Sequence, residues 1–131
     1  MTKDEMSKLM VQIFNEYQEF REAGQKEYAH KTEDSFANFN RVAERLGIDR
    51  KAVLMVYAEK HIDGIHSFIQ GHRSQREDVR GRIKDVIVYM CLLYGMVVVE
   101  ESQREIEQIA EGHPSLLEKK YGALGWVDPP A

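Results

Sequence analysis

The apolar stretch VIVYMCLLYGMVVV, residues 86–99, decides the fold because it is the longest hydrophobic run in the chain. It is too short to cross a bilayer, since a membrane-spanning helix needs about 20 apolar residues. We therefore predict the interior of a helix that is buried on most of its sides. Cys91 is the only cysteine of the sequence and lies in this run. We expect its thiol to be buried and unreactive, which excludes an intrachain disulfide and a multi-cysteine metal site.

On either side of this run, apolar residues recur at helical spacing between polar joints. We expect helices at about residues 3–22, 35–46, 50–69 and 76–99, with a charged continuation at 100–111. Gly24, Gly47 and Gly71 are the predicted stops. Asp34 and Asp49 are the predicted N-caps. No strand pattern competes, so the sequence predicts an all-α fold, an antiparallel bundle of four to five helices.

The domain organisation follows from where the helical pattern ends. His113-Pro114 interrupts it, and we predict one helical domain over residues 1–112 and an irregular segment over 113–131. Trp126 lies in that segment, and we expect it to dock on this or a neighbouring subunit. A chain of 131 residues buries only a modest core. Its apolar content therefore predicts a homo-oligomer, at least a dimer.

Charge excludes some partners. The formal net charge is -4, which disfavours DNA or an anionic membrane as the main partner. A net negative charge is still compatible with a small anion that binds in a local basic pocket. The sequence begins Met-Thr-Lys-Asp-Glu, without the pattern of a secretory leader, so we expect a cytoplasmic protein. We find no glycine-rich phosphate loop, no nucleophile elbow and no zinc-type spacing.

Two of the predicted helices carry residues that could bind a ligand or a metal ion. In the 50–69 helix, His61 lies within the apolar stripe. A histidine at such a position either binds a ligand or, more commonly, is a core residue that is satisfied by one polar partner. Glu59, Asp63 and His66 stack beside it, as a divalent-cation site or as a solvated face. In the next helix, Asp85 borders the apolar run. We expect it to be buried and paired, because a buried carboxylate needs a cation or hydrogen-bond donors.

Short motifs in the middle of the chain resemble a known family. They are Asp34-Ser35-Phe36-Ala37-Asn38-Phe39, Leu46-Gly47-Ile48, Glu59-Lys60, and Glu77 with Asp85 and Tyr89. Over about residues 28–99 the chain resembles the nucleotide modification associated domain 1 family of tailed phages. That family is similar in layout to the all-α nucleoside-triphosphate pyrophosphatases of the MazG and dUTPase type. The resemblance implies an all-α fold and a nucleotide ligand.

The sequence departs from the pyrophosphatases where their metal-binding acidic pairs should stand. The segment Arg80-Gly81-Arg82 is cationic there. Guanidinium groups repel a divalent ion but bind phosphate through paired hydrogen bonds. We therefore expect a nucleotide-binding pocket without a cofactor. The candidate ligand-binding residues are Arg80, Arg82, Lys60, His61, Phe36, Tyr28 and Asn38.

Three functions stay open at this point. The first is a phage-type protein that binds, and sequesters without cleaving, a nucleotide or a cyclic nucleotide messenger. The second is a Mg²⁺-dependent nucleotide pyrophosphohydrolase. Its metal ligands would be Glu59, Asp63, Glu77 and Asp85. The third is a helical structural or interaction protein with no small ligand. The number of carboxylates that converge at one site distinguishes the binding protein from the pyrophosphohydrolase.

Overall fold

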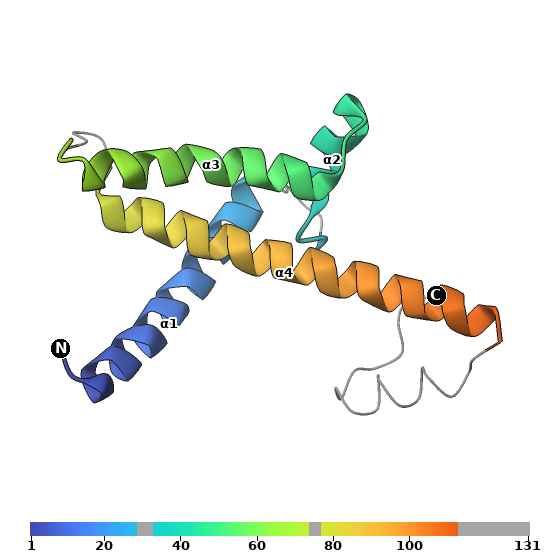
Figure 1. Cartoon of the computed structure of the whole chain (residues 1–131), viewed down its shortest axis with the longest axis horizontal. Coiled ribbons are helices and arrows are strands. Elements are labelled where there is room, and N and C mark those ends of the chain that lie inside the picture. The colour runs from blue at the N-terminus through green and yellow to red at the C-terminus, as the bar shows by residue number, and fades with distance from the viewer. Residues whose placement is uncertain (29–32, 74–76, 113–131) are drawn as a thin grey trace. The chain divides into compact units, whose positions relative to one another are not determined.

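The computed structural model describes residues 1–28, 33–73 and 77–112, and for residues 24–28 it describes the backbone alone. Within these ranges it contains four helices and no strand (Figure 1). The helices are α1 (Lys3–Tyr28), α2 (Ala37–Leu46), α3 (Arg50–Ile69) and α4 (Val79–Ala110). The predicted all-α class is confirmed. Residues 113–131, and with them Trp126, lie outside the described ranges.

Local capping sets the end of α2 and the bounds of α3 where the sequence predicted them. The predicted start of α2 was wrong, because the helix begins at Ala37 with Phe36 as its N-cap residue, and no side chain, Asp34 included, caps it. The Lys51 backbone N–H donates to the Asp49 Oδ1 atom at 2.8 Å, which caps the first turn of α3. Gly47 ends α2 with φ 65°, and Gly71 follows α3 with φ 98°. These left-handed conformations favour glycine, because a Cβ atom would be strained there. The N-cap and stop predictions around α3 are confirmed.

Two further predicted boundaries, in α1 and α4, were wrong. We expected α1 to stop at Gly24, but the helix continues to Tyr28. A glycine inside a helix costs only about 1 kcal/mol, so by itself it does not end one. We expected α4 to begin near residue 76, but it begins at Val79, after Asp78 accepts a hydrogen bond from the Arg80 N–H at 2.8 Å. The charged residues after 99 continue this helix to Ala110.

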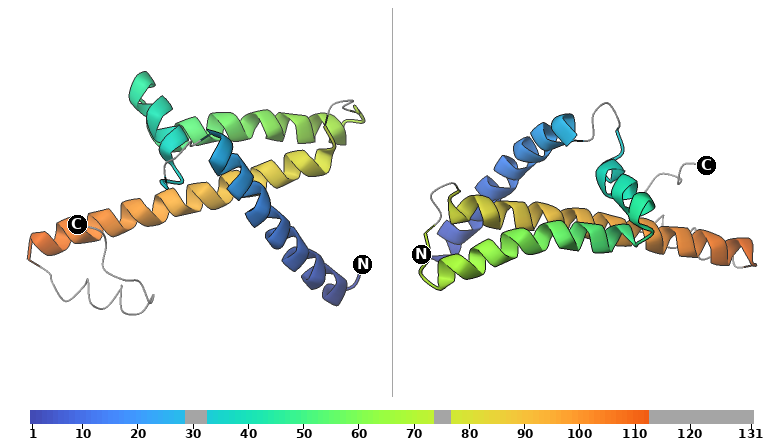
Figure 2. Two further views of the ribbon diagram at one scale, coloured as in Figure 1. Left: turned by 180° about the vertical axis from the view of Figure 1, so that it is seen from behind. Right: turned by 90° about the horizontal axis from the view of Figure 1, so that it is seen from above.

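The chain divides into two compact units, Met1–Leu93 and Tyr94–Ala131, with the boundary inside α4. In the first unit, α3 and the beginning of α4 run antiparallel, side by side in every view (Figures 1 and 2). Tyr89 of α4 meets the Phe39 ring of α2, with ring centroids 6.3 Å apart. The α1 helix is joined to α4 by an ion pair of 2.7 Å between Glu16 and Lys84.

The core of the first unit is small. Its buried hydrophobic side chains are Tyr17, Phe39, Val53, Leu54 and Ala58. None of residues 86–93 is fully buried, and Cys91 is exposed. The expectations of a central helix covered on most sides and of a buried thiol were therefore wrong. A helix is covered only where another element packs on it, and the described neighbours of α4 leave part of its circumference open.

None of the helices in the described ranges has the length and apolar content that crossing a membrane would require.

Because the core is small, we expect truncation at two aliphatic positions of α3 to change the free energy of unfolding by very different amounts. Leu54 is 0% exposed, and Val56 is 64% exposed. Leu54→Ala should lower the free energy of unfolding by about 2–5 kcal/mol, because it removes buried methyl groups and leaves a cavity. Val56→Ala should change it by less than about 0.5 kcal/mol. Urea denaturation of both variants measures the difference, and similar losses would contradict this description of the core.

Candidate functional site

Three metal-ligating side chains converge between α3 and α4. His61 comes from the middle of α3, Asp85 from the second turn of α4, and Glu77 from the segment just before α4. One potential ligand atom of each residue lies within 4.8 Å of the other two. The antiparallel pairing of the two helices produces this cluster, because it places the middle of α3 opposite the early turns of α4 (Figure 1).

The His61 and Asp85 side chains lie at a distance that fits an ion pair as well as two ligands of one metal ion. The His61 Nδ1 atom lies 3.2 Å from Asp85 Oδ2. Nevertheless, Nδ1 is enclosed and makes no hydrogen bond within the described part of the chain. Two ligand atoms about 2.1 Å from a shared ion, at an angle of about 100°, would be about 3.2 Å apart. The spacing therefore suits a bound divalent cation, provided that His61 is neutral and Nδ1 carries a lone pair.

Partial burial disfavours the ionised form of Asp85. The side chains of His61 and Asp85 are 17% and 18% exposed. Loss of solvent raises the pKa of Asp85, and the charge of Glu77 raises it further, while His61 and Arg82 oppose the shift. An ionised carboxylate that has lost water contacts is destabilised unless nearby positive charges or hydrogen-bond donors replace them. A bound cation would be such a charge. The expected burial of Asp85 is thus nearly reached, with His61 as its neighbour.

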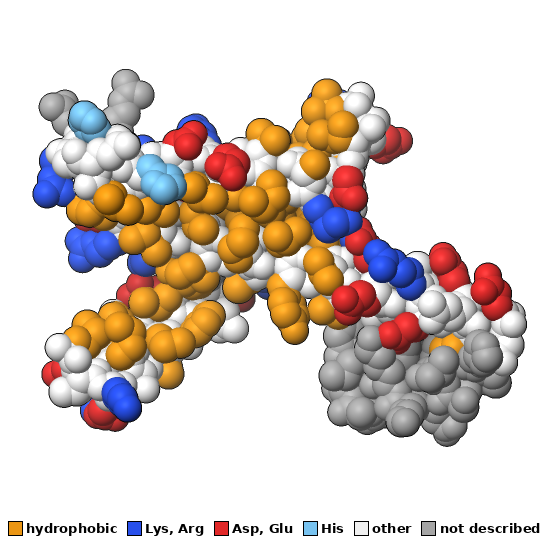
Figure 3. Space-filling model, viewed as in Figure 1, with side chains coloured by type: hydrophobic (Ala, Val, Ile, Leu, Met, Phe, Trp, Pro, Cys, Tyr) orange, Lys and Arg blue, Asp and Glu red, His pale blue; other side chains and the backbone are white. Residues whose placement is uncertain are grey.

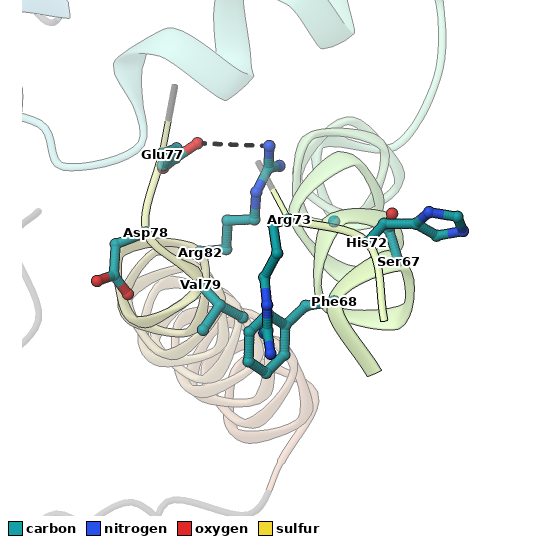
Figure 4. Close-up of a pocket in the computed structure, with 9 residues that line it drawn as sticks. Ser67, Phe68, His72, Arg73, Glu77, Asp78, Val79 and Arg82 are labelled. Carbon is teal, nitrogen blue, oxygen red and sulfur yellow. Dashed lines mark ion pairs between the residues drawn. The ribbon is translucent and has the colours of Figure 1, made fainter. Parts of the chain in front are cut away.

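Arg82 lies against α3 at Gly64. A Cβ atom at position 64 would collide with the Arg82 side chain, so the residue there has to be glycine for Arg82 to keep its place. Glycine in a helix interior is otherwise unfavourable. The Arg82 side chain is 21% exposed, and its Nη2 atom lies 3.8 Å from Glu77 Oε2 (Figure 4). Arg82 therefore lies beside the cluster and contributes a fixed positive charge.

A pocket of about 320 Å³ adjoins the cluster and shares Glu77 and Arg82 with it. Its other lining residues come from the end of α3, the following turn and the start of α4: Gly64, Ser67, Phe68, His72, Arg73, Asp78 and Val79. The Arg73 guanidinium carbon lies 4.6 Å from the centroid of the Phe68 ring (Figure 4). The pocket therefore combines two guanidinium groups with an aromatic surface, beside three potential metal ligands.

Arg80 and Arg82, predicted together, are separated in the structure. The Arg80 side chain is 83% exposed and lies 2.9 Å from Asp78, whereas Arg82 lines the pocket. The hydrogen bond from Arg80 lowers the pKa of Asp78 to about 2. Residues two apart on a helix point to nearly opposite sides, which accounts for the separation.

The remaining predicted residues lie elsewhere. Glu59, Lys60 and Asp63 are exposed on α3 and belong to neither the cluster nor the pocket. Phe36 and Asn38 lie at the start of α2. The Arg50 guanidinium covers the Phe36 ring at 4.9 Å, and Asn38 accepts a hydrogen bond from Arg41. The Tyr28 side chain is outside the described residues.

Sequence reasoning missed Gly64, Phe68 and Arg73. Gly64 had a detectable signal, because a lone glycine inside a long helical pattern often marks a close approach. Arg73 had a weaker one, since it follows Gly71 in a polar joint. His61 was assigned to the nucleotide, but the structure places it among the potential metal ligands.

Comparisons of the chain with protein-family models, with curated proteins and with solved structures find no match.

The two aspartates of this region should respond to pH in opposite directions. The pKa of Asp85 is raised above 3.8, so its favourable contribution is complete below pH 3.8 and is lost as pH rises through the folded-state value. The pKa of Asp78 is lowered to about 2, so its contribution is present above pH 3.8 and is lost as pH falls toward 2.

Urea denaturation without added metal, from pH 3 to pH 7, tests this contrast. Relative to the wild type, Asp85→Asn should gain stability as pH rises from 4 to 7. Asp78→Asn should lose stability over the rise from pH 3 to pH 5. The assignment of Asp85 as a partly desolvated carboxylate is wrong if Asp85→Asn follows the wild-type pH profile.

Proposed function

We propose that this protein binds the phosphate groups of a nucleotide through Arg82 and a divalent cation held by His61, Glu77 and Asp85. The supporting observation is the convergence of three ligand atoms within 4.8 Å, beside a pocket that Arg82 also lines. A phosphate group that bridges the cation and the guanidinium would be bound by two positive charges from different directions.

The donor set favours particular ions. One imidazole nitrogen and two carboxylates suit Mn²⁺ or Zn²⁺, whereas Mg²⁺ prefers oxygen ligands alone. Three protein ligands leave coordination positions for phosphate oxygens and water. The Mg²⁺ expected for the enzyme alternative is therefore replaced in this proposal by a cation that accepts nitrogen, with Mn²⁺ as the first candidate.

Arg82 makes cation and phosphate binding interdependent. Without phosphate, its positive charge beside Glu77 and Asp85 disfavours a divalent ion in the same cluster. With phosphate, the negative charges between the two cations remove that repulsion. Each ligand should therefore raise the affinity for the other by the same factor.

A nucleotide is favoured over a simple phosphate ester by the rest of the pocket. Phe68 and Arg73 present an aromatic ring and a planar guanidinium beside the phosphate-binding end. Bases stack on both kinds of surface.

The number of carboxylates in the cluster favours nucleotide binding without cleavage. Of the four acidic residues that the hydrolase alternative requires, Glu77 and Asp85 join the cluster, while Glu59 and Asp63 lie outside it. Hydrolysis stays the second candidate for a specific reason. The open positions on a three-ligand ion would allow it to bind and activate water.

Calorimetry and thermal unfolding with a panel of linear and cyclic nucleotides, each with Mn²⁺ or Mg²⁺, test the proposal. We expect at least one nucleotide to raise the melting temperature, and to do so more with Mn²⁺. Mass spectrometry of the released ligand separates binding from hydrolysis. If no nucleotide binds under any of these conditions, the proposal is wrong and the structural alternative stands.

Variants of Arg82 should change the two affinities in opposite directions. Arg82→Gln should weaken nucleotide binding by about tenfold or more, and should tighten Mn²⁺ binding in the absence of nucleotide, because it removes a repelling charge. Gly64→Ala should weaken nucleotide binding as well, since it displaces Arg82 without removing a charge. Arg80→Gln is the matched control and should leave both affinities unchanged. Parallel losses in Arg80→Gln and Arg82→Gln would contradict the assigned pocket.

A further inference from the structure

Aromatic ring contacts connect the ligand cluster with the core of the first unit. The His61 imidazole and the Tyr89 ring have centroids 5.7 Å apart, and their planes are inclined by 37°. Tyr89 also meets Phe39 of α2, with ring centroids 6.3 Å apart and an interplanar angle of 77°. Phe39 is 5% exposed. The Tyr89 ring therefore contacts both a potential metal ligand and a buried side chain of the core.

The position of Tyr89 on α4 explains why its ring reaches the cluster. Asp85 and Tyr89 are four residues apart, so they lie on the same face of the helix. Asp85 Oδ2 lies 3.2 Å from the His61 Nδ1 atom, and Tyr89 packs against the same imidazole one turn further along. The α4 helix thus contacts His61 with a carboxylate at its nitrogen and with an aromatic ring beside it.

An imidazole binds a cation only when the lone pair of its nitrogen points at the ion. The χ2 torsion of histidine is broad, so neighbouring groups have to set the plane of the ring. Within the described part of the chain, the enclosed His61 Nδ1 atom makes no hydrogen bond that would do so. The His61 side chain is 17% exposed, and the Tyr89 ring is one of the groups that enclose it. Ring packing can therefore supply the constraint that a hydrogen bond does not.

We propose that Tyr89 is a positioning residue of the cation site, and that its ring holds the His61 imidazole in the plane that keeps Nδ1 toward Asp85. The inference rests on the proposed function, because Tyr89 has this role only if the cluster binds a cation. Phe39 supports the arrangement from α2, since aromatic rings at this separation attract each other. A ligand that is already oriented loses little freedom when the ion arrives, so the ring contact raises the affinity for the cation.

Titration of the full chain with Mn²⁺ alone tests this role. Tyr89→Leu removes the ring but keeps an apolar side chain, and it should lower the Mn²⁺ affinity by about tenfold or more, as loss of a group that orients a metal-ligating histidine does. Tyr89→Phe keeps the ring and should retain most of the affinity. Tyr94→Leu is the matched control and should leave the affinity unchanged, because Tyr94 belongs to the same helix but is 75% exposed.

A double-mutant cycle with His61→Ala separates positioning from a general loss of structure. If Tyr89 acts through His61, Tyr89→Leu should lower the Mn²⁺ affinity much less in the His61→Ala background than in the wild type. A merely structural role would give equal losses in both backgrounds. Equal losses, no loss in the wild-type background, or the same loss in Tyr89→Phe as in Tyr89→Leu overturns the inference.

The wild-type titration separates this inference from the proposed function. A wild type that binds no Mn²⁺ at millimolar concentration contradicts the proposed cation site, and this inference with it. A wild type that binds Mn²⁺ as tightly as Tyr89→Leu contradicts the positioning role alone. If circular dichroism shows that Tyr89→Leu has lost its helix content, Tyr89→Met takes its place in the cycle, because methionine is a flexible side chain that fills the gap without a ring.

Discussion

The contact of the Arg82 side chain with α3 at Gly64 is the constraint on which the site depends. With any larger residue at position 64, the Arg82 side chain would have to leave its place. Arg82 in turn lies beside Glu77, which belongs to both the ligand cluster and the pocket. One missing Cβ atom thus sets the position of the fixed positive charge relative to the potential metal ligands. The cost of glycine in a helix interior is offset by this arrangement.

Partial burial gives the cluster its chemistry. If Asp85 were fully exposed, water would screen it and a bound ion would gain little. If it were fully buried and unpaired, it would be neutral. At 18% exposure its pKa is raised, and the carboxylate still faces His61 and the charge of Arg82. Such a group lowers the stability of the fold when it ionises, and a cation bound beside it would offset that loss. Perturbed carboxylates of this kind are typical of functional sites.

The thin core and the exposed apolar side chains of α1 have a common origin. The chain is apolar enough for a larger core, but in the first unit the described helices cover α4 on part of its circumference. The hydrophobic surface that remains is distributed over α1 and the faces of α3 and α4 (Figure 3).

The sequence by itself determined the helices, because caps, glycine stops and apolar periodicity act over a few residues. Asp49 and Gly71 bounded α3 as predicted, and the importance of Asp85 followed from its place beside an apolar run. Only the tertiary structure decided which side chains meet. It joined His61 to Glu77 and Asp85, placed the Arg82 side chain against Gly64, and left Cys91 exposed. Those outcomes depend on the pairing, register and closeness of two helices far apart in sequence, which no local pattern encodes.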